Sequence, residues 1–501
     1  MLVSSMSDLI CIARGSQTHC SIRSGRLVPP LDYEVVPIEW SEITAPYTIA
    51  RKLRENRICF TCCYTVMSEM PEPVVHHLEL CVCDANDTLK RLQKYGFKLF
   101  AKRQTSFCES LAVKLGRIIL VVSQRNYNAV IHNDAIRAEP LTILCCEGDS
   151  QTQHSIDTVF NLAFSVKKAD LNKIIDNINS IGGKVIQPPT QVQDEHGVLT
   201  YAIIKSCCGN IVHTLINKDD YHGPFCTGFE IVESDTCEVL EDNNTLDINY
   251  IDHVTFACYS GNSQNIIEFY EKCFGMNRFQ IGNNDDERIN GLILSEDVGL
   301  RLRAMKYYWC SETGLSYRTK ENSPDAMMLV VVESLKGQVN CNVQAYLNDH
   351  QNEGIEHVAL NSMSITKTVS TLQKRGVQFR KPPMAYYEEL RKHEKISVLK
   401  QDLDALSRLG ILLDNEDDSG GSPESREKAK KYLMQIFSQP LFDKKTFFFE
   451  VIERFGAKGL GTGNILALVR SIREEERRNS MKHDAKKQEI SKESVTDIRN
   501  C

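Results

Sequence analysis

The stretch GIEHVALNSMSITKTVSTLQKRGVQF, residues 354–379, contains the structural unit from which the chain is built. It opens with an apolar run typical of a buried strand and passes through a short polar turn. Apolar side chains then recur at three- and four-residue spacing, at Ile365, Val369 and Leu372, before Gly376. This order predicts a strand, an amphipathic helix, a glycine in the left-handed conformation at the helix end, and a second strand.

A histidine and an acid interrupt the apolar run of the first strand. Because successive side chains of a strand point to opposite faces, we expect His357 and Ala359 to share one face and Glu356 to lie on the other. A single histidine in a strand is usually a hydrogen-bonded core residue. Its role therefore depends on whether other parts of the chain repeat the pattern.

The same order of elements occurs four times. The first strands read VVHHLELCVCD (74–84), TVFNLAFSVKK (158–168), IDHVTFACYSG (251–261) and GIEHVALNSMS (354–364), and each precedes an amphipathic helix that ends at a glycine. Further β-rich stretches follow each helix, for example YAIIKSCCGNIVHTLI (201–216). The repeat predicts an α+β fold of four βαβββ modules, which pair into two tandem open barrels.

The repeat also suggests the domain boundaries. We expect one barrel at residues 74–235 and the other at residues 246–470. Residues 1–73 form an N-terminal extension and residues 471–501 a charged helical tail. An insertion at about 414–430, with the composition of a solvated loop, separates two strands of the second barrel.

Composition narrows the class of protein. With 501 residues, 42% hydrophobic and 25% charged, and a net charge of −7, the chain is typical of a soluble globular protein without a basic field for nucleic acid. No apolar run reaches the roughly 18 residues that a transmembrane helix needs. The nineteen cysteines include one CxxC pair, Cys59 and Cys62, which favours buried reduced thiols over a zinc site.

The first 27 residues are rich in serine and carry Arg14, Arg23 and Arg26 but only one acid, Asp8. This composition fits a mitochondrial presequence, and a cytoplasmic location is the alternative.

Aligning the four first strands puts His77, Asn161, His253 and His357 at one repeating position. Only the last two strands match in chemistry. A pseudo-twofold axis within the second barrel would bring these two histidines to a common centre, which favours a pair of ligands over two core residues.

A carboxylate is expected from the last strand of a module. Glu450 interrupts the apolar run in TFFFEVIERFG (446–456), and a buried carboxylate has to be paired, protonated or bound to a metal. We interpret Glu453 and Arg454 as a solvent-facing pair at the strand end. Two imidazoles and one carboxylate with open coordination positions suit non-haem Fe(II), O2 and a 2-oxo acid substrate, although zinc or manganese would accept the same ligands.

These residues resemble the 4-hydroxyphenylpyruvate dioxygenase family of the vicinal oxygen chelate superfamily, and especially its dioxygenase-like branch. The resemblance runs from about residue 74 to 473, without the insertion. It is carried by IDHVTFACYSG, GIEHVALNSMSI, KPPMAYYEEL (381–390), YHGPFCTGFEIV (221–232) and LMQIFSQPLFDKKTFFFEVIERFGAKGLGTGNILAL (433–468).

The resemblance implies that His253, His357 and Glu450 are catalytic and bind Fe(II), and that the first barrel carries no metal. It also assigns Gln435, Phe437 and Asn464 to the substrate pocket. His77 is then structural. In GLGTGN (459–464) we expect a tight turn that lets the last helix close over the pocket, because the chain lacks the rest of a dinucleotide-binding motif.

The pocket departs from the family at several positions. Aromatic or polar residues of the family are replaced by Leu460, Ile465, Val332, Leu302, Asn342 and Glu356. These changes leave the metal chemistry and alter substrate recognition.

The resemblance implies a dioxygenase that decarboxylates 4-hydroxyphenylpyruvate. The aliphatic replacements favour 4-hydroxymandelate as product, in a mitochondrial route from tyrosine-derived acids to the ubiquinone head group. The alternatives are homogentisate formation in tyrosine catabolism and a metal-binding scaffold without turnover. The expected partners are the small-molecule substrate and O2, and a homodimer is one expectation for the assembly.

Overall fold

The structure is a computed structural model. It describes residues 73–105, 108–126, 156–232, 246–279, 281, 290–294, 298–306, 328–338, 340–392, 402–415 and 431–470, together with a hairpin of β1 (Ser21–Arg23) and β2 (Arg26–Val28). The remainder of the N-terminal extension, most of the predicted insertion and the charged tail lie outside the described residues, as do Cys59 and Cys62. Asp414 belongs to a strand, so the insertion begins after Asn415.

Two modules build the first sheet. The first module contains β3 (Val74–Val82), α3 (Ala85–Lys94), β4 (Lys98–Gln104), β5 (Cys108–Leu115) and β6 (Ile118–Arg125). The second contains β7 (Thr158–Ser165), α5 (Lys168–Ser180), β8 (Val185–Asp194), β9 (Gly197–Lys205) and β10 (Val212–Asn217). With β11 (Glu230–Ile231) at one edge, the strand order is β11-β4-β5-β6-β3-β7-β10-β9-β8.

The second sheet repeats this plan. Its first module contains β12 (Ile248–Cys258), α6 (Ser263–Phe274), β13 (Asn277–Phe279), β14 (Leu292–Leu294), β15 (Leu300–Lys306) and β16 (Met328–Ser334). After α8 (Cys341–His350) come β17 (Gly354–Ser362), α9 (Ile365–Lys374), α10 (Met384–Lys392), α12 (Leu403–Leu409), β18 (Leu412–Asn415), β19 (Tyr432–Phe437) and β20 (Phe448–Phe455). A last helix covers residues 462–470.

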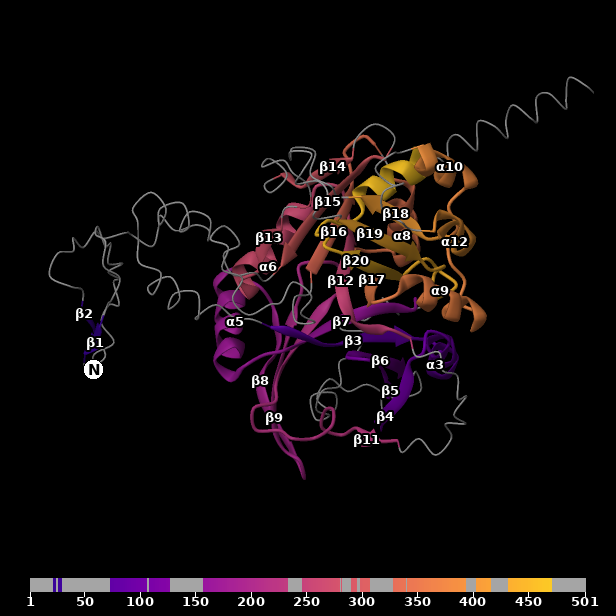
Figure 1. Ribbon diagram of the computed structural model, residues 1–501. Coiled ribbons are helices and arrows are strands. Elements are labelled where there is room, and N and C mark those ends of the chain that lie inside the picture. Colours follow the sequence, from indigo (N-terminus) through magenta and orange to yellow (C-terminus); the bar gives the residue numbers. More distant parts are fainter. Residues whose placement is uncertain are drawn as a thin grey trace, which may run out of the picture.

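The two sheets share one pairing rule. At the centre of each, the first strands of two modules pair antiparallel, β3 with β7 and β12 with β17. The last strand of each module lies parallel to its first strand, as β20 does beside β17. Each sheet curls around its own interior, and Figure 1 shows the first below the second. The four predicted βαβββ modules and the two open barrels are confirmed.

The glycines at the helix ends follow the prediction. Gly96, Gly182, Gly275 and Gly376 all have positive φ angles, between 70° and 92°. The left-handed conformation turns the chain from each helix back toward the sheet, and it costs glycine little because glycine has no Cβ.

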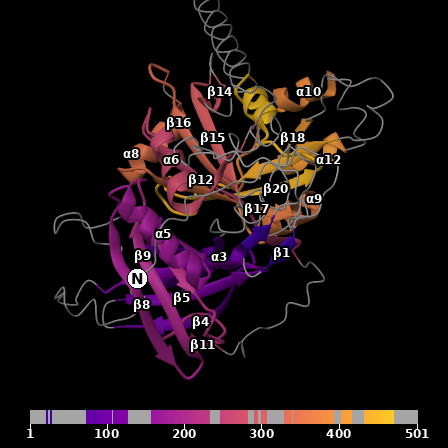
Figure 2. The same ribbon diagram turned by 90° about the vertical axis from the view of Figure 1, so that its left-hand side faces the viewer.

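One hydrophobic core joins the two barrels. α5 and α6 lie side by side at the junction (Figures 1 and 2). The Tyr95 and Phe97 rings contact Phe449, with ring centroids 4.8 and 6.0 Å apart. The first barrel therefore supports β20 from behind, on the face opposite Glu450. No helix in the described ranges is long and apolar enough to cross a membrane.

Candidate metal centre

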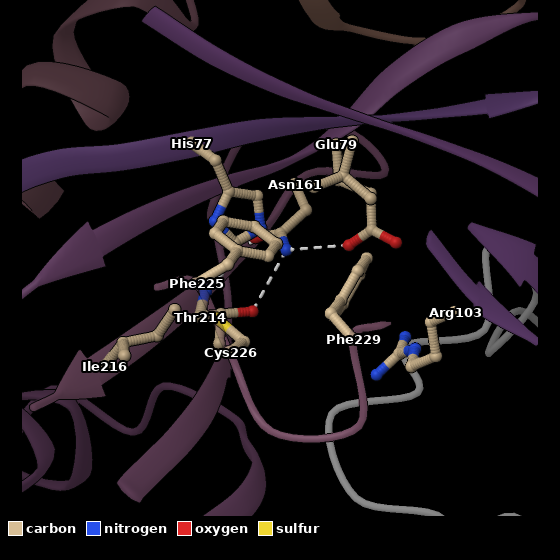
Figure 3. A pocket seen from close by; sticks show the side chains of 10 residues that line it. His77, Glu79, Arg103, Asn161, Thr214, Ile216, Phe225, Cys226 and Phe229 are labelled. Carbon is tan, nitrogen blue, oxygen red and sulfur yellow. Dashed lines mark hydrogen bonds between the residues drawn. The ribbon is translucent and has the colours of Figure 1, made fainter. Parts of the chain in front are cut away.

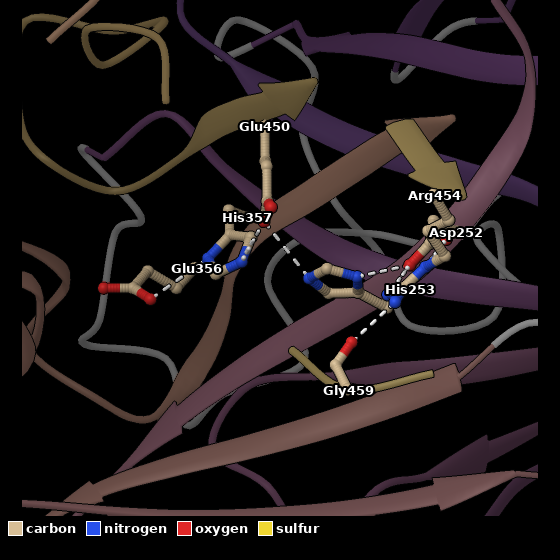
Figure 4. A network of polar contacts seen from close by, with 7 residues as sticks. All are labelled: Asp252, His253, Glu356, His357, Glu450, Arg454 and Gly459. Carbon is tan, nitrogen blue, oxygen red and sulfur yellow. Dashed lines mark hydrogen bonds and ion pairs between the residues drawn. The ribbon is translucent and has the colours of Figure 1, made fainter. Parts of the chain in front are cut away.

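Three neighbouring strands of the second sheet bring His253, His357 and Glu450 together (Figure 4). A carboxylate oxygen of Glu450 lies 3.2 Å from Nε2 of His253 and 3.5 Å from Nε2 of His357. All three residues are buried, and one donor atom of each lies within 4.8 Å of the others. Within the described ranges, no other cluster of three histidine, cysteine or acidic residues has this geometry.

Strand register explains the convergence. In the antiparallel pair of β12 and β17, His253 lies opposite Ala359 and His357 lies opposite Thr255. This places the two histidines at equivalent positions of the two modules. In the parallel pair of β17 and β20, Ala359 is also the neighbour of Glu450. The carboxylate therefore projects from the same face as both imidazoles.

A β-bulge precedes each histidine. Successive pairs run from Ile251–Leu360 to His253–Ala359, which leaves Asp252 without an opposite residue. On β17, successive pairs run from His357–Thr255 to Ile355–Phe256, so Glu356 also has no opposite residue. A bulge breaks the alternation of side chains and re-aims one of them. The prediction that Glu356 faces away from His357 is therefore wrong.

Both bulged acids contact the histidine that follows them. An oxygen of Asp252 lies 2.8 Å from Nδ1 of His253, and an oxygen of Glu356 lies 3.2 Å from Nδ1 of His357. A carboxylate accepts and cannot donate, so it keeps the proton on Nδ1 and makes Nε2 the nitrogen whose proton a metal can displace. This is the tautomer in which Nε2 can bind a metal.

Arg454 fixes the first of these acids. Its Nε and Nη2 donate to the two carboxylate oxygens of Asp252 at 2.7 and 2.8 Å, and Nη1 donates to the carbonyl oxygen of Gly459. The prediction of a solvent-facing pair with Glu453 is wrong, because Arg454 is largely buried and Glu453 accepts from the Ile365 amide. The spacing from Glu450 to Arg454 is four residues, so strand alternation already puts both on one face.

The electrostatics of the cluster favour a cation at its centre. Burial opposes the charge on Glu450, but the adjacent His253 outweighs it and lowers the pKa of the carboxyl to about 2. Burial likewise opposes protonation of His253, yet Glu450 and Asp252 raise its pKa to about 9. The pKa of His357 is also raised, since hydrogen bonds to Glu356 and Glu450 outweigh burial. In the metal-free protein, protons supply positive charge that a divalent cation would replace.

One wall beside the cluster is aliphatic. Val332 of β16 lies opposite Leu302 of β15 and beside Ala257 of β12. These residues are buried in one cluster with Leu460, and Ile465 of the last helix packs against it. Val332 and Ile465, which the resemblance assigned to the pocket, therefore belong to one apolar cluster.

A second group of side chains is aromatic and polar. Phe448 stacks on His357 with ring centroids 4.7 Å apart, and the Phe437 ring lies 6.3 Å from His357. Gln435 and Asn464 are buried, and Asn464 Oδ1 accepts from the Tyr386 hydroxyl at 2.8 Å. Among the described residues, Gln435 Oε1 and Asn464 Nδ2 have no hydrogen-bond partner. Buried polar groups of this kind are normally satisfied, so both are available to a ligand.

Asn342 does not join the site. It is exposed in the first turn of α8, where its backbone amide donates to Asn340. The gapped correspondence that assigned it to the pocket is wrong for the described structure, because the side chain at this helix start points to solvent.

Comparison with known proteins agrees with this geometry. The model for the glyoxalase, bleomycin resistance protein and dioxygenase superfamily matches residues 250–394. The chain is 29% identical to the human 4-hydroxyphenylpyruvate dioxygenase-like protein, over 80% of this chain and 97% of the human one. It is 31% identical to 4-hydroxyphenylpyruvate dioxygenase of Dictyostelium discoideum, over 66% of this chain and 82% of that protein.

The chain belongs to the 4-hydroxyphenylpyruvate dioxygenase family. Among solved structures, a mutant of 4-hydroxymandelate synthase from Streptomyces coelicolor matches with a TM-score of 0.57 and 23% identity, over 81% of this chain and 100% of that chain. This similarity supports the fold of two tandem barrels.

In this member of the 4-hydroxyphenylpyruvate dioxygenase family the first barrel holds a different cluster at the equivalent place (Figure 3). Register puts His77, Asn161 and Thr214 where the second barrel has His253, His357 and Glu450. Asn161 Nδ2 donates to Thr214 at 3.0 Å and to Glu79 at 3.2 Å. The remaining cavity, of about 20 Å³, has room for roughly one water molecule. Nδ1 of His77 lies 2.8 Å from Nδ1 of His76, so hydrogen bonds within the protein engage His77 as well as Asn161.

Proposed function

We propose that this chain is an Fe(II)-dependent dioxygenase that acts on 4-hydroxyphenylpyruvate, or on a close arylpyruvate, with loss of CO2. The cluster of His253, His357 and Glu450 carries the proposal, because its donor atoms converge in a member of the 4-hydroxyphenylpyruvate dioxygenase family. Two imidazoles and one carboxylate with open positions form the ligand set typical of non-haem Fe(II) oxygenases.

The protein's own residues prepare the site. Nε2 of both histidines and the Glu450 carboxylate would hold Fe(II), which when bound would offer open coordination positions to the 2-oxo acid and O2, while the 2-oxo acid supplies electrons as it loses CO2. Asp252 and Glu356 hold the Nδ1 protons, so Nε2 of each histidine is the atom that loses its proton to bind the metal. Because the three strands are neighbours in one sheet, the donor atoms are arranged before the metal binds.

The aliphatic wall and the aromatic and polar group suit an aromatic substrate with one polar end. The ring would lie between the aliphatic wall of Val332 and Ile465 and the Phe437 side chain. Gln435 Oε1 is an unpaired acceptor and Asn464 Nδ2 an unpaired donor. A phenolic hydroxyl both donates and accepts, so the 4-hydroxyl of 4-hydroxyphenylpyruvate can satisfy both groups.

For the product, we propose 4-hydroxymandelate. The support is the aliphatic wall, in which Val332, Leu302 and Ile465 stand at positions where the dioxygenase pattern has polar or aromatic residues. These aliphatic side chains offer the substrate ring no hydrogen bond that would position it for oxidation of the ring. Chromatography of the aromatic product tests the assignment, since homogentisate, with its migrated side chain, would refute it.

Oxygen uptake tests the enzymatic proposal. Protein titrated to one Fe(II) per chain should consume O2 with 4-hydroxyphenylpyruvate, Glu450→Ala should abolish uptake, and Glu453→Gln on the same strand should retain it. No uptake with any 2-oxo acid at full iron loading would refute the proposal. A metal-binding scaffold would instead keep its cellular role in the Glu450→Ala variant.

Three further expectations complete the proposal. We place the protein in mitochondria, in a route to the ubiquinone head group, and expect a homodimer. Fractionation of cells that express the full chain, isotope tracing from labelled tyrosine, and sedimentation of the purified protein test them separately.

A further inference from the structure

Glu356 occupies the same place at His357 that Asp252 occupies at His253 (Figure 4). Each acid is the unpaired residue of a β-bulge, and each carboxylate contacts Nδ1 of the next residue. Glu356 and Asp252 are both buried, with side-chain exposures of 11% and 8%. The pseudo-twofold relation of the two modules therefore extends beyond the histidines to the acids behind them.

We propose that Glu356 is a positioning residue of the metal centre, which acts through His357 rather than on the substrate. It would hold the Nδ1 proton of His357, present Nε2 to the metal and increase the electron density on that nitrogen. The inference rests on the proposed metal-binding function and adds a second carboxylate–histidine unit to it. It also replaces the expected assignment of Glu356 to the substrate pocket.

A cation lies in the surroundings of Glu356, as one does at Asp252. Arg380 lies within electrostatic range of Glu356, and its guanidinium is 4.6 Å from the centroid of the Phe448 ring. Phe448 in turn stacks on His357. Arg454 contacts Asp252 directly, whereas Arg380 contacts the Phe448 ring that stacks on His357. Each histidine therefore has one acid behind it and one arginine nearby.

A glutamine at position 356 would lack the properties that the proposed role needs. Its amide carries donors as well as an acceptor, so it can orient to stabilise the other imidazole tautomer, in which Nε2 bears the proton. It also lacks the negative charge that makes the imidazole a stronger donor to a cation. Glu356→Gln keeps the shape of the side chain and removes both effects.

Metal affinity measured without turnover tests the inference. Metal-free full-length protein would be titrated anaerobically with Fe(II), and separately with Co(II), against a competing chelator. We expect Glu356→Gln to weaken binding by about 10- to 100-fold, the usual effect of losing such an outer partner. Glu356→Asp, which keeps the charge but shortens the reach, should fall between. The midpoint potential of the iron should rise in Glu356→Gln, because a less electron-rich histidine favours Fe(II).

Glu453→Gln is the matched control, since Glu453 accepts a backbone hydrogen bond and contacts neither histidine in the described structure. Its affinity should stay within about twofold of wild type, and thermal unfolding of all metal-free variants should be compared. Wild-type affinity in Glu356→Gln, with or without a loss of arylpyruvate binding, would overturn the inference. Failure of the wild-type protein to bind either metal would instead overturn the proposed function itself.

Discussion

Replacing Glu450 with glutamine in the metal-free protein tests the electrostatics of the cluster. The Glu450 carboxylate lies 3.2 Å from Nε2 of His253. At an effective dielectric constant of about 20, this distance corresponds to an attraction of about 5 kcal/mol. Burial of both groups opposes it, and Glu450 together with Asp252 raises the pKa of His253 from 6.5 to about 9. That rise corresponds to about 3 kcal/mol of stability.

The pH dependence has a definite sign. The folded pKa of His253 is raised, so its contribution is fully present below pH 6.5 and is lost as the pH rises through about 9. The folded pKa of Glu450 is lowered, so its contribution is present above pH 4.5 and is lost as the pH falls through about 2. The pair therefore stabilises the metal-free protein most strongly between pH 4.5 and 6.5.

Denaturant unfolding in the presence of a chelator provides the measurement. At about pH 6, Glu450→Gln should lower the free energy of unfolding by at most about 3 kcal/mol, since Asp252 supplies part of the pKa rise of His253. The deficit should shrink below about 1 kcal/mol near pH 9.5, where most of His253 has lost its proton. Glu453→Gln controls for loss of a half-buried carboxylate on the same strand that contacts no histidine. An equal deficit at both pH values, or none at either, would refute the electrostatic reasoning.

Three other perturbations have definite expected outcomes. The apparent affinity for Fe(II) should rise by at least about tenfold per pH unit from pH 6.5 to about 9, as seen by chelator competition, because the metal displaces the proton of His253 and, where His357 is protonated, that proton too. Arg454→Met should lower the free energy of unfolding by about 3–5 kcal/mol in denaturant melts, since it leaves the Asp252 carboxylate buried without its cation. Gly461→Ala should lower the melting temperature and raise the KM for arylpyruvates, because Gly461 has a φ of +65° and an added Cβ would lie 2.4 Å from Gln435 Oε1. An unchanged KM in that variant would show that the turn at Gly461 does not affect substrate binding.

Much of the fold was predictable because its signals are local and repeated. The sequence of each module shows the same order of strand, amphipathic helix and glycine. Four copies of this weak pattern support one another. The metal cluster was predictable for the same reason. His253 and His357 hold equivalent places in two copies of one module, and Glu450 is a charge in an apolar strand that needs a partner.

The residues behind the cluster, Asp252, Glu356 and Arg454, are positioned by the register between strands. The alternation of side chains along a single strand does not predict that register. Two bulges insert Asp252 and Glu356 into a regular pattern and turn them toward the histidines. Arg454 contacts Asp252, which lies 202 residues earlier in the sequence. Strand alternation puts Arg454 on the same face as Glu450, but it predicts neither the contact with Asp252 nor the burial of the Arg454 side chain. Asn342 shows the converse, since a plausible correspondence places in the pocket a side chain that the helix start leaves in solvent.

The sequence by itself determined the module, its fourfold repetition, and the three side chains whose chemistry suits a non-haem metal. Those features follow from hydrophobic periodicity and from the cost of burying a charge, which act within a few residues. Only the tertiary structure decided which nitrogen of each histidine faces Glu450 and which acid stands behind it. That choice is made by pairing between strands, where a single extra residue redirects a side chain.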